Sequence, residues 1–106
     1  MSDLVKHPSH YNKEDRMECW DEQEIAYGTF AVVCFDILNA HKYMYRAGEK
    51  KGNPKEQDIA KINNYINHAN KLMKRLGFFK KRKARKIMNK LKEYLDKEGI
   101  DCGREE

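Results

Sequence analysis

Three successive stretches of this chain carry apolar residues at every third or fourth position, and glycine-containing turns separate them. Such spacing places the apolar side chains of a stretch on one face of an α-helix. A shorter stretch precedes them, and no segment shows the alternation that is typical of a β-strand. We therefore predict an all-α fold, a small helical hairpin or bundle with three main helices near residues 29–47, 54–76 and 80–98, one short helix near 18–27 and an extended N-terminal arm.

The length of 106 residues fits a single domain with a small core. We predict an N-terminal arm over residues 1–16, a helical domain over residues 17–98 and a flexible tail over residues 99–106. The arm is too polar to fold onto its own domain for stability alone. We therefore expect a homo-oligomer with sites at or near the subunit boundaries.

Helical spacing also predicts which side chains form the core. In the short helix these are Trp20, Ile25 and Tyr27. The next helix has Thr29 as its expected N-cap, and its predicted apolar face leaves Asp36 outside and comprises Phe30, Val33, Cys34, Ile37, Leu38, His41 and Tyr45. The apolar faces of the last two helices comprise Ile59, Ile62, Ile66, Ala69, Met73 and Leu76, and then Ile87, Met88, Leu91, Tyr94 and Leu95.

Charge is distributed unevenly along the chain, whose formal net charge is +5. Residues 1–58 carry a net charge of −3, residues 59–92 hold twelve Lys or Arg and no acid, and residues 93–106 carry −4. The positive middle segment suits a polyanion such as a nucleotide, a nucleic acid or an acidic lipid surface. The alternative is a solvated basic face that the acidic ends or another subunit neutralises.

The three cysteines, Cys19, Cys34 and Cys102, form no CxxC pair. This pattern indicates reduced thiols in a cytosolic protein, and neither a disulfide framework nor a zinc site. No signal peptide is visible, and no apolar run approaches the roughly 18 residues of a membrane helix. We therefore expect no membrane partner.

The segment His41–Gly48 closes the first main apolar stretch and combines cations with aromatic rings. Residues four apart share a helix face, so Lys42 and Arg46 are expected side by side next to Tyr43. Together with Lys50 just beyond the helix, they have the charge and aromatic surface to hold a phosphate and a base. The alternative is that these cations only offset the negative end of a helix that a glycine terminates.

Near the start of the next helix, Asp58, Lys61 and Tyr65 follow one another at three- and four-residue spacing. They are therefore expected on neighbouring positions of one helix face. Asp58 has three interpretations: an ion pair with Lys61, a carboxylate that orients Lys42 or Arg46 across the helix pair, or a catalytic base.

In the N-terminal arm, His7, His10 and Tyr11 lie close together in the sequence. A histidine pair beside a tyrosine has the groups to contact phosphate and base. The further ligands that a metal ion needs are missing, so no metal site is predicted here. The alternative is an arm whose rings pack onto the helical domain.

These motifs together resemble a known family. The segments HPSHYN, MECWDE and HKYMYRAGEKKGNPKEQDIAKINNYI resemble, in that order, small bacteriophage proteins catalogued as the uncharacterised domain DUF3310, whose members are often labelled nucleotide kinase. The resemblance covers about residues 5–70. It implies that the arm motif contains His7, His10 and Tyr11, that a KYxxRxG motif contains Lys42, Tyr43, Arg46 and Gly48, and that a third motif contains Lys50, Asp58, Lys61 and Tyr65. This chain departs from the third motif at Asn64, where an aromatic residue commonly precedes the tyrosine.

From these observations and the resemblance we expect a phage-type nucleotide-binding protein that works in the cytoplasm of an infected bacterial host. One form of this hypothesis is a nucleoside monophosphate kinase with Asp58 as catalytic carboxylate, ATP and Mg²⁺ as cofactors and no Walker A motif. Another is a non-catalytic protein that sequesters a nucleotide signal to counter host defence. A third alternative is nucleic-acid binding through the basic segment 71–92, which contains the run KKRKARK over residues 80–86.

Overall fold

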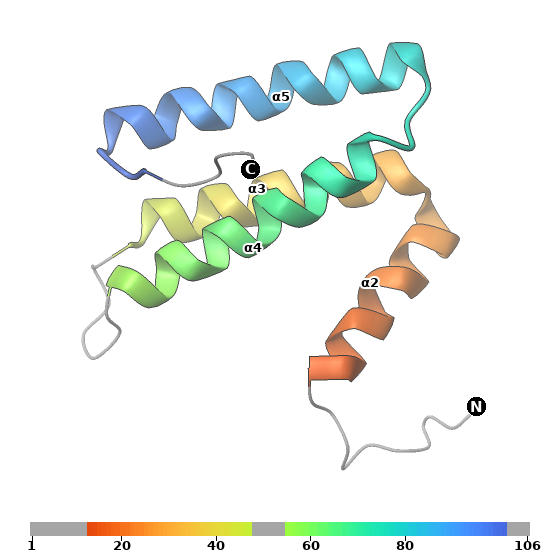
Figure 1. The fold of residues 1–106 in the computed structure, drawn as a ribbon, viewed down its shortest axis with the longest axis horizontal. Helices are drawn as coiled ribbons and strands as arrows, with labels where there is room; N and C mark the ends of the chain where they lie inside the picture. Colours follow the sequence, from red (N-terminus) through yellow and green to blue (C-terminus); the bar gives the residue numbers. More distant parts are fainter. Residues whose placement is uncertain (1–12, 48–54, 102–106) are drawn as a thin grey trace.

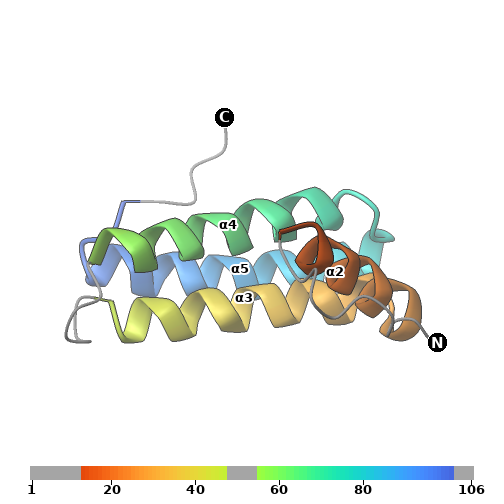
Figure 2. The same cartoon turned by 90° about the horizontal axis from the view of Figure 1, so that it is seen from below.

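The computed structural model describes residues 13–47 and 55–101, with side chains from Cys19 onward. Four α-helices occur in this part of the chain, α2 (Lys13–Tyr27), α3 (Thr29–Tyr45), α4 (Lys55–Met73) and α5 (Phe78–Lys97), and no strand. The predicted all-α bundle is therefore confirmed. Figures 1 and 2 show α3, α4 and α5 lying alongside one another, while α2 slants away from one end of the bundle. No helix among the described residues is long and apolar enough to cross a membrane.

The core lies between α3, α4 and α5. Ala40 on α3 and Ala69 on α4 are fully buried, and small side chains at a helix contact allow a short distance between helix axes. The third side of the core is closed by an apolar stripe of α5 that repeats at four- and three-residue spacing and comprises Ala84, Met88, Leu91 and Leu95. Full burial of one such leucine stabilises the fold by about 1.5–3 kcal/mol.

The helix α3 buries a face that differs in part from the predicted one. Val33 and Ile37 are buried as expected, but Leu38 is 66% exposed and Tyr45 is 80% exposed. The buried face comprises Val32, Val33, Asp36, Ile37, Ala40 and Met44. Large apolar residues occur nearly all round this helix, so spacing alone leaves its rotation open. The small Ala40 and the hydrogen-bonded Asp36 decide the rotation, because they fit against the neighbouring helices.

The helix α2 packs on the bundle through Trp20, which is 7% exposed. The prediction that Ile25 and Tyr27 also face the core is wrong, because they are 86% and 75% exposed. Ile25 lies about 140° round the helix from Trp20 and so points away from the bundle. The helix begins at Lys13, so the last four residues of the predicted arm, 13–16, belong to it. The remainder of that arm lies outside the described residues.

The turn between α2 and α3 is held by polar contacts. Gly28, not Thr29, is the N-cap of α3, with φ 97° and ψ 155°. The Thr29 hydroxyl instead donates to Glu24 Oε2 at 2.7 Å, which lowers the pKa of that carboxyl. Arg75 Nη1, beyond the end of α4, donates to both Glu24 oxygens at 2.7 and 2.9 Å. These bonds tie the end of α2 to the end of α4.

The C-terminal end of α5 is closed by Gly99, whose φ is 71°. The backbone N–H of Ile100 donates to the carbonyl of Leu95 at 2.9 Å, which is the 6→1 hydrogen bond of a Schellman motif. Ile100 is buried, at 5% exposure. The segment predicted as a flexible tail therefore starts with two residues that belong to the folded unit, and residues 102–106 lie outside the described part.

Candidate functional site

The last turn of α3 and the first half of α4 bring three cations around one tyrosine ring. From the centroid of the Tyr43 ring, Lys42 Nζ lies at 4.9 Å, Arg46 Cζ at 5.1 Å and Lys61 Nζ at 5.0 Å. Attraction between each cation and the ring face offsets part of the repulsion among the cations. The sequence prediction that Lys42 and Arg46 lie side by side next to Tyr43 is thus confirmed, and Lys61 joins them from α4.

The Tyr65 ring extends this group along α4. It stacks on Tyr43 with a centroid distance of 6.0 Å and an interplanar angle of 14°. It also forms near-perpendicular contacts with the rings of Trp20 and Phe35, at centroid distances of 5.8 and 6.3 Å. Aromatic contacts in this distance range add about 0.5–1.5 kcal/mol each beyond their buried area. We call the set of Lys42, Tyr43, Arg46, Lys61 and Tyr65 the cation–tyrosine cluster.

The cations of this cluster have no acidic partner within the part of the chain that the structure describes, where the ion pairs join other residues. Arg46 Nε is also buried and has no hydrogen-bond acceptor among the described residues. A buried donor left unpaired costs about 1–3 kcal/mol. An anion that accepts this hydrogen bond would remove that cost and neutralise the cations, so the cluster has the chemistry of a phosphate site.

A buried polar network lies next to the Trp20 ring, where α2 packs on α3 and α4. The Asp36 carboxylate is 0% exposed and accepts a hydrogen bond from Trp20 Nε1 at 3.1 Å. Its second oxygen lies 2.6 Å from His68 Nδ1, and the His68 ring stacks on Trp20 at 3.7 Å and 9°. Burial raises the pKa of Asp36 to about 6, although its hydrogen bonds to His68 and Trp20 lower it. This network fixes α2 against α3 and α4.

Five of the predicted site residues are brought together in the cation–tyrosine cluster. His7, His10, Tyr11 and Lys50 lie outside the described residues. Asp58 is fully buried in the first turn of α4, where a negative charge is favoured by the helix dipole. Its predicted catalytic role stays a prediction. The described residues contain no group of three or more His, Cys, Asp or Glu side chains that could hold a metal ion.

The sequence prediction missed the residues that surround the cluster on the α2 side, namely Trp20, Phe35, Asp36 and His68. A signal was present, because Asp36 is a single acid inside the apolar stretch that forms α3. A charged residue on a packed helix needs a buried partner, and its partner His68 is 32 positions away in the sequence. Only the pairing of α3 with α4 brings the two together.

Two of the three cysteines lie within the described residues. Cys19 and Cys34 are free, and Cys102 lies outside the described residues. Burial raises the pKa of the Cys34 thiol, so this group stays protonated at neutral pH and is a poor nucleophile.

Comparison with known proteins identifies a family whose description names no activity. The family described as "Protein of unknown function (DUF3310)" matches residues 5–67 of this chain, more than half of its length. The chain belongs to this family, as the three sequence motifs indicated. No curated protein and no solved structure matches it. The match contains the whole cation–tyrosine cluster and ends before the last turn of α4, so α5 lies beyond it.

Proposed function

We propose that this protein binds a nucleotide on the face formed by α3 and α4. The observation that carries the proposal is the buried, unpaired Arg46 Nε beside two lysines that have no acidic partner among the described residues. If these cations served only to offset the end of α3, their charged groups would favour open water over the face of a single ring. An anionic ligand accounts for both the crowding and the unpaired donor.

The cluster offers different contacts to the two ends of a nucleotide. The Arg46 guanidinium presents a planar fork for two phosphate oxygens, and Lys42 and Lys61 act as point charges beside it. The Tyr65 ring contacts the ring of Phe35. Phe35 is 40% exposed and gives a base a surface to pack on. Under this proposal, the arm residues His7, His10 and Tyr11, together with Lys50, complete the pocket.

We favour binding without turnover. A catalytic carboxylate must reach the proton that it removes or the metal that it holds, and Asp58 is fully buried. Under this proposal the protein is a bacteriophage product that sequesters a nucleotide signal in the infected cell. The nucleoside monophosphate kinase is the competing form, because it uses the same phosphate contacts.

The binding site is tested by calorimetric titration of a panel of nucleoside mono-, di- and triphosphates into the wild type, Arg46→Ala and Lys97→Ala. A charge-assisted hydrogen bond is worth roughly 1.5–3 kcal/mol, so Arg46→Ala should weaken binding about ten- to a hundredfold. Lys97 is the matched control, because its ammonium group also lies over a tyrosine ring, 5.5 Å from the centroid of Tyr94, but it belongs to the last turn of α5 and is not part of the cluster. Equal losses in both variants would contradict the proposed site.

Turnover is tested by incubating the full chain with nucleoside monophosphates, ATP and Mg²⁺ and separating the products by chromatography. We expect the monophosphates to remain unchanged while they compete for binding. Formation of diphosphates that stops in Asp58→Asn would establish the kinase form instead.

A further inference from the structure

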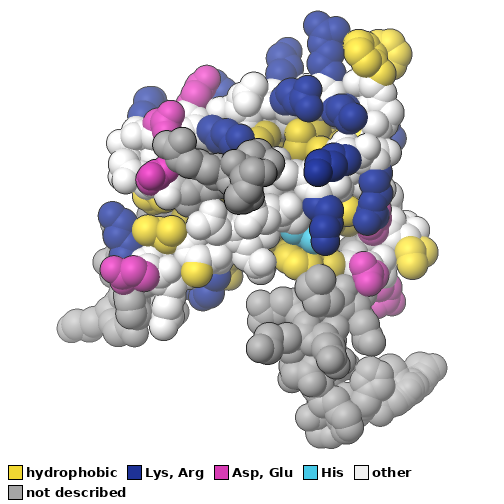
Figure 3. Space-filling view, in the orientation of Figure 1, with side chains coloured by type: hydrophobic (Ala, Val, Ile, Leu, Met, Phe, Trp, Pro, Cys, Tyr) yellow, Lys and Arg dark blue, Asp and Glu magenta, His cyan; other side chains and the backbone are white. Residues whose placement is uncertain are grey.

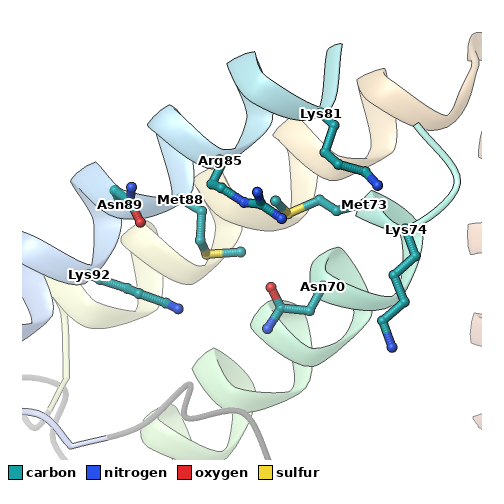
Figure 4. A pocket seen from close by; sticks show the side chains of 8 residues that line it. All are labelled: Asn70, Met73, Lys74, Lys81, Arg85, Met88, Asn89 and Lys92. Atoms are coloured by element: carbon teal, nitrogen blue, oxygen red, sulfur yellow. The ribbon is translucent and has the colours of Figure 1, made fainter. Parts of the chain in front are cut away.

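A groove between the end of α4 and the first two thirds of α5 lies outside the proposed nucleotide site. It encloses about 350 Å³. Figure 4 shows Lys81, Arg85 and Lys92 reaching from α5 toward α4, with Met73 and Met88 between the helices. We call the hollow lined by Lys81, Arg85 and Lys92 of α5 and by Asn70 and Lys74 on the α4 side the basic groove.

The charge of the basic groove is not balanced locally. None of its four cations forms an ion pair with a described acid, and the surrounding segment 59–92 contains no Asp or Glu. Figure 3 shows Lys and Arg side chains gathered over the end of the bundle where α4 leads into α5. Like charges four residues apart, as at Lys81 and Arg85, destabilise an isolated helix. Such an arrangement suits a ligand that carries several negative charges along its length.

An aromatic surface adjoins the groove. A second hollow of about 290 Å³ shares Lys81 and Arg85 with the basic groove and reaches Phe78. Phe78 and Phe79 are 71% and 80% exposed, and their rings meet edge to face at 5.3 Å. Proteins that bind single strands combine a positive groove along the backbone with exposed aromatic rings on which bases stack.

We propose that the basic groove binds a single-stranded nucleic acid, with its phosphates along Lys81, Arg85, Lys92 and Lys74 and a base on Phe78. A lipid surface fits these residues less well for two reasons. The apolar stripe of α5 is buried in the core, and the exposed rings of Phe78 and Phe79 are confined to the first turn, so this helix has no continuous apolar face to insert into lipid. The cations line a concave space between two helices, which a strand can enter and a flat headgroup layer cannot.

This site is separate from the cation–tyrosine cluster. Asn70 is nine residues after Lys61 on α4, which is about two and a half helical turns, so the two residues point to opposite sides of the helix. The rise along the axis over these residues is about 14 Å. The groove also depends on α5, which lies beyond the family match, whereas the cluster lies within it.

The test is fluorescence anisotropy of a labelled oligothymidylate of about 16 nucleotides, titrated with the full chain at roughly 50 mM and 200 mM salt. Lys81→Ala/Arg85→Ala removes two groove cations. The matched control Lys90→Ala/Lys97→Ala removes the same charge from α5 outside the groove. Circular dichroism checks that every variant keeps the helical content of the wild type.

We expect the groove variant to bind at least tenfold more weakly and the control to change less than about twofold. A plot of log K against log salt concentration has a negative slope, and each lost phosphate contact makes that slope less steep by about 0.7 for a single strand. The slope of the groove variant alone should therefore become less steep by about 1.4. Phe78→Ala should weaken binding about tenfold through lost stacking, and Arg46→Ala should leave it unchanged.

Several outcomes would overturn the proposal. One is an equal loss in the groove variant and the control, which would mean attraction by net charge alone. Another is the absence of binding at the lower salt concentration. A third is groove-dependent binding to phosphatidylserine vesicles without binding to the oligonucleotide, and a fourth is loss of oligonucleotide binding in Arg46→Ala but not in the groove variant.

Discussion

Asp36 lies in an environment unlike that of an ordinary surface carboxylate. It is fully buried between Trp20 and His68, and its pKa is raised to about 6 from an ordinary value of 3.8. Because the pKa is raised in the folded protein, folding is favoured by the protonated form. The stability that Asp36 contributes is therefore fully present below pH 3.8 and is lost as the pH rises through about 6.

We predict that Asp36→Asn removes this pH dependence. An asparagine can still accept from Trp20 Nε1 and donate to His68 Nδ1, so both hydrogen bonds survive. The free energies of unfolding of wild type and variant should agree near pH 4 and differ by about 3 kcal/mol at pH 7, with the variant more stable. Urea denaturation from pH 4 to pH 7 measures this difference. Two curves that run parallel over the whole range would show that Asp36 does not titrate as described.

At the scale of elements, the joint between α2 and α3 depends on one backbone conformation. Gly28 has φ 97° and ψ 155°, a region that is essentially accessible to glycine alone. It is also the point at which α2 turns away from the bundle (Figure 1). The Glu24 carboxylate accepts hydrogen bonds from Thr29 and Arg75, and these bonds stabilise the turn between α2 and α3.

We predict that Gly28→Ala lowers the free energy of unfolding by about 1–3 kcal/mol through backbone strain. The control is Gly77→Ala, at the N-cap of α5. Gly77 has φ −70°, and neither glycine has an atom within 4 Å of the position of an added Cβ. The control should change stability by less than about 0.5 kcal/mol. Thermal unfolding of both variants makes the comparison, and equal effects would rule out strain as the cause.

Helices, and most of their buried faces, follow from the sequence because apolar spacing is a local property. The faces of α4 and α5 agree with the prediction at Ile62, Ile66, Met88 and Leu91. The rotation of α3 and the exposure of Ile25 were not predictable, since they depend on how the helices meet. In the site, spacing placed Lys42 beside Arg46, but the approach of Lys61 and the pairing of Asp36 with His68 arise only from packing of α3 against α4.

The whole molecule exposes apolar side chains on α2 and α3. Ile25, Tyr27 and Leu38 are 86%, 75% and 66% exposed, and Tyr27 and Phe35 line a hollow of about 130 Å³ where the two helices meet. Apolar surface of this kind often marks a protein–protein contact. The homo-oligomer predicted from the sequence would have this surface as its interface.

We predict that Ile25→Glu shifts the protein toward monomer, since the new charge would be buried without a partner in such an interface. Light scattering after size-exclusion chromatography at micromolar concentration measures the mass. Asn64→Glu, an exposed position on α4, is the control and should keep the mass of the wild type. A wild-type protein that is monomeric at this concentration would refute both the oligomer and this interface.

The separation of α5 into a buried face and an exposed face determines which substitutions this helix can accept. Four of its twenty residues are buried and complete the core, so the family-matched part of the chain relies on a helix that lies outside the match. Most of the remaining positions face outward and place few demands on packing, although Ile87 packs partly against the core. Variants that keep Ala84, Met88, Leu91 and Leu95 can therefore exchange the outer surface of α5, and with it the partner recognised there, while the cation–tyrosine cluster keeps its geometry.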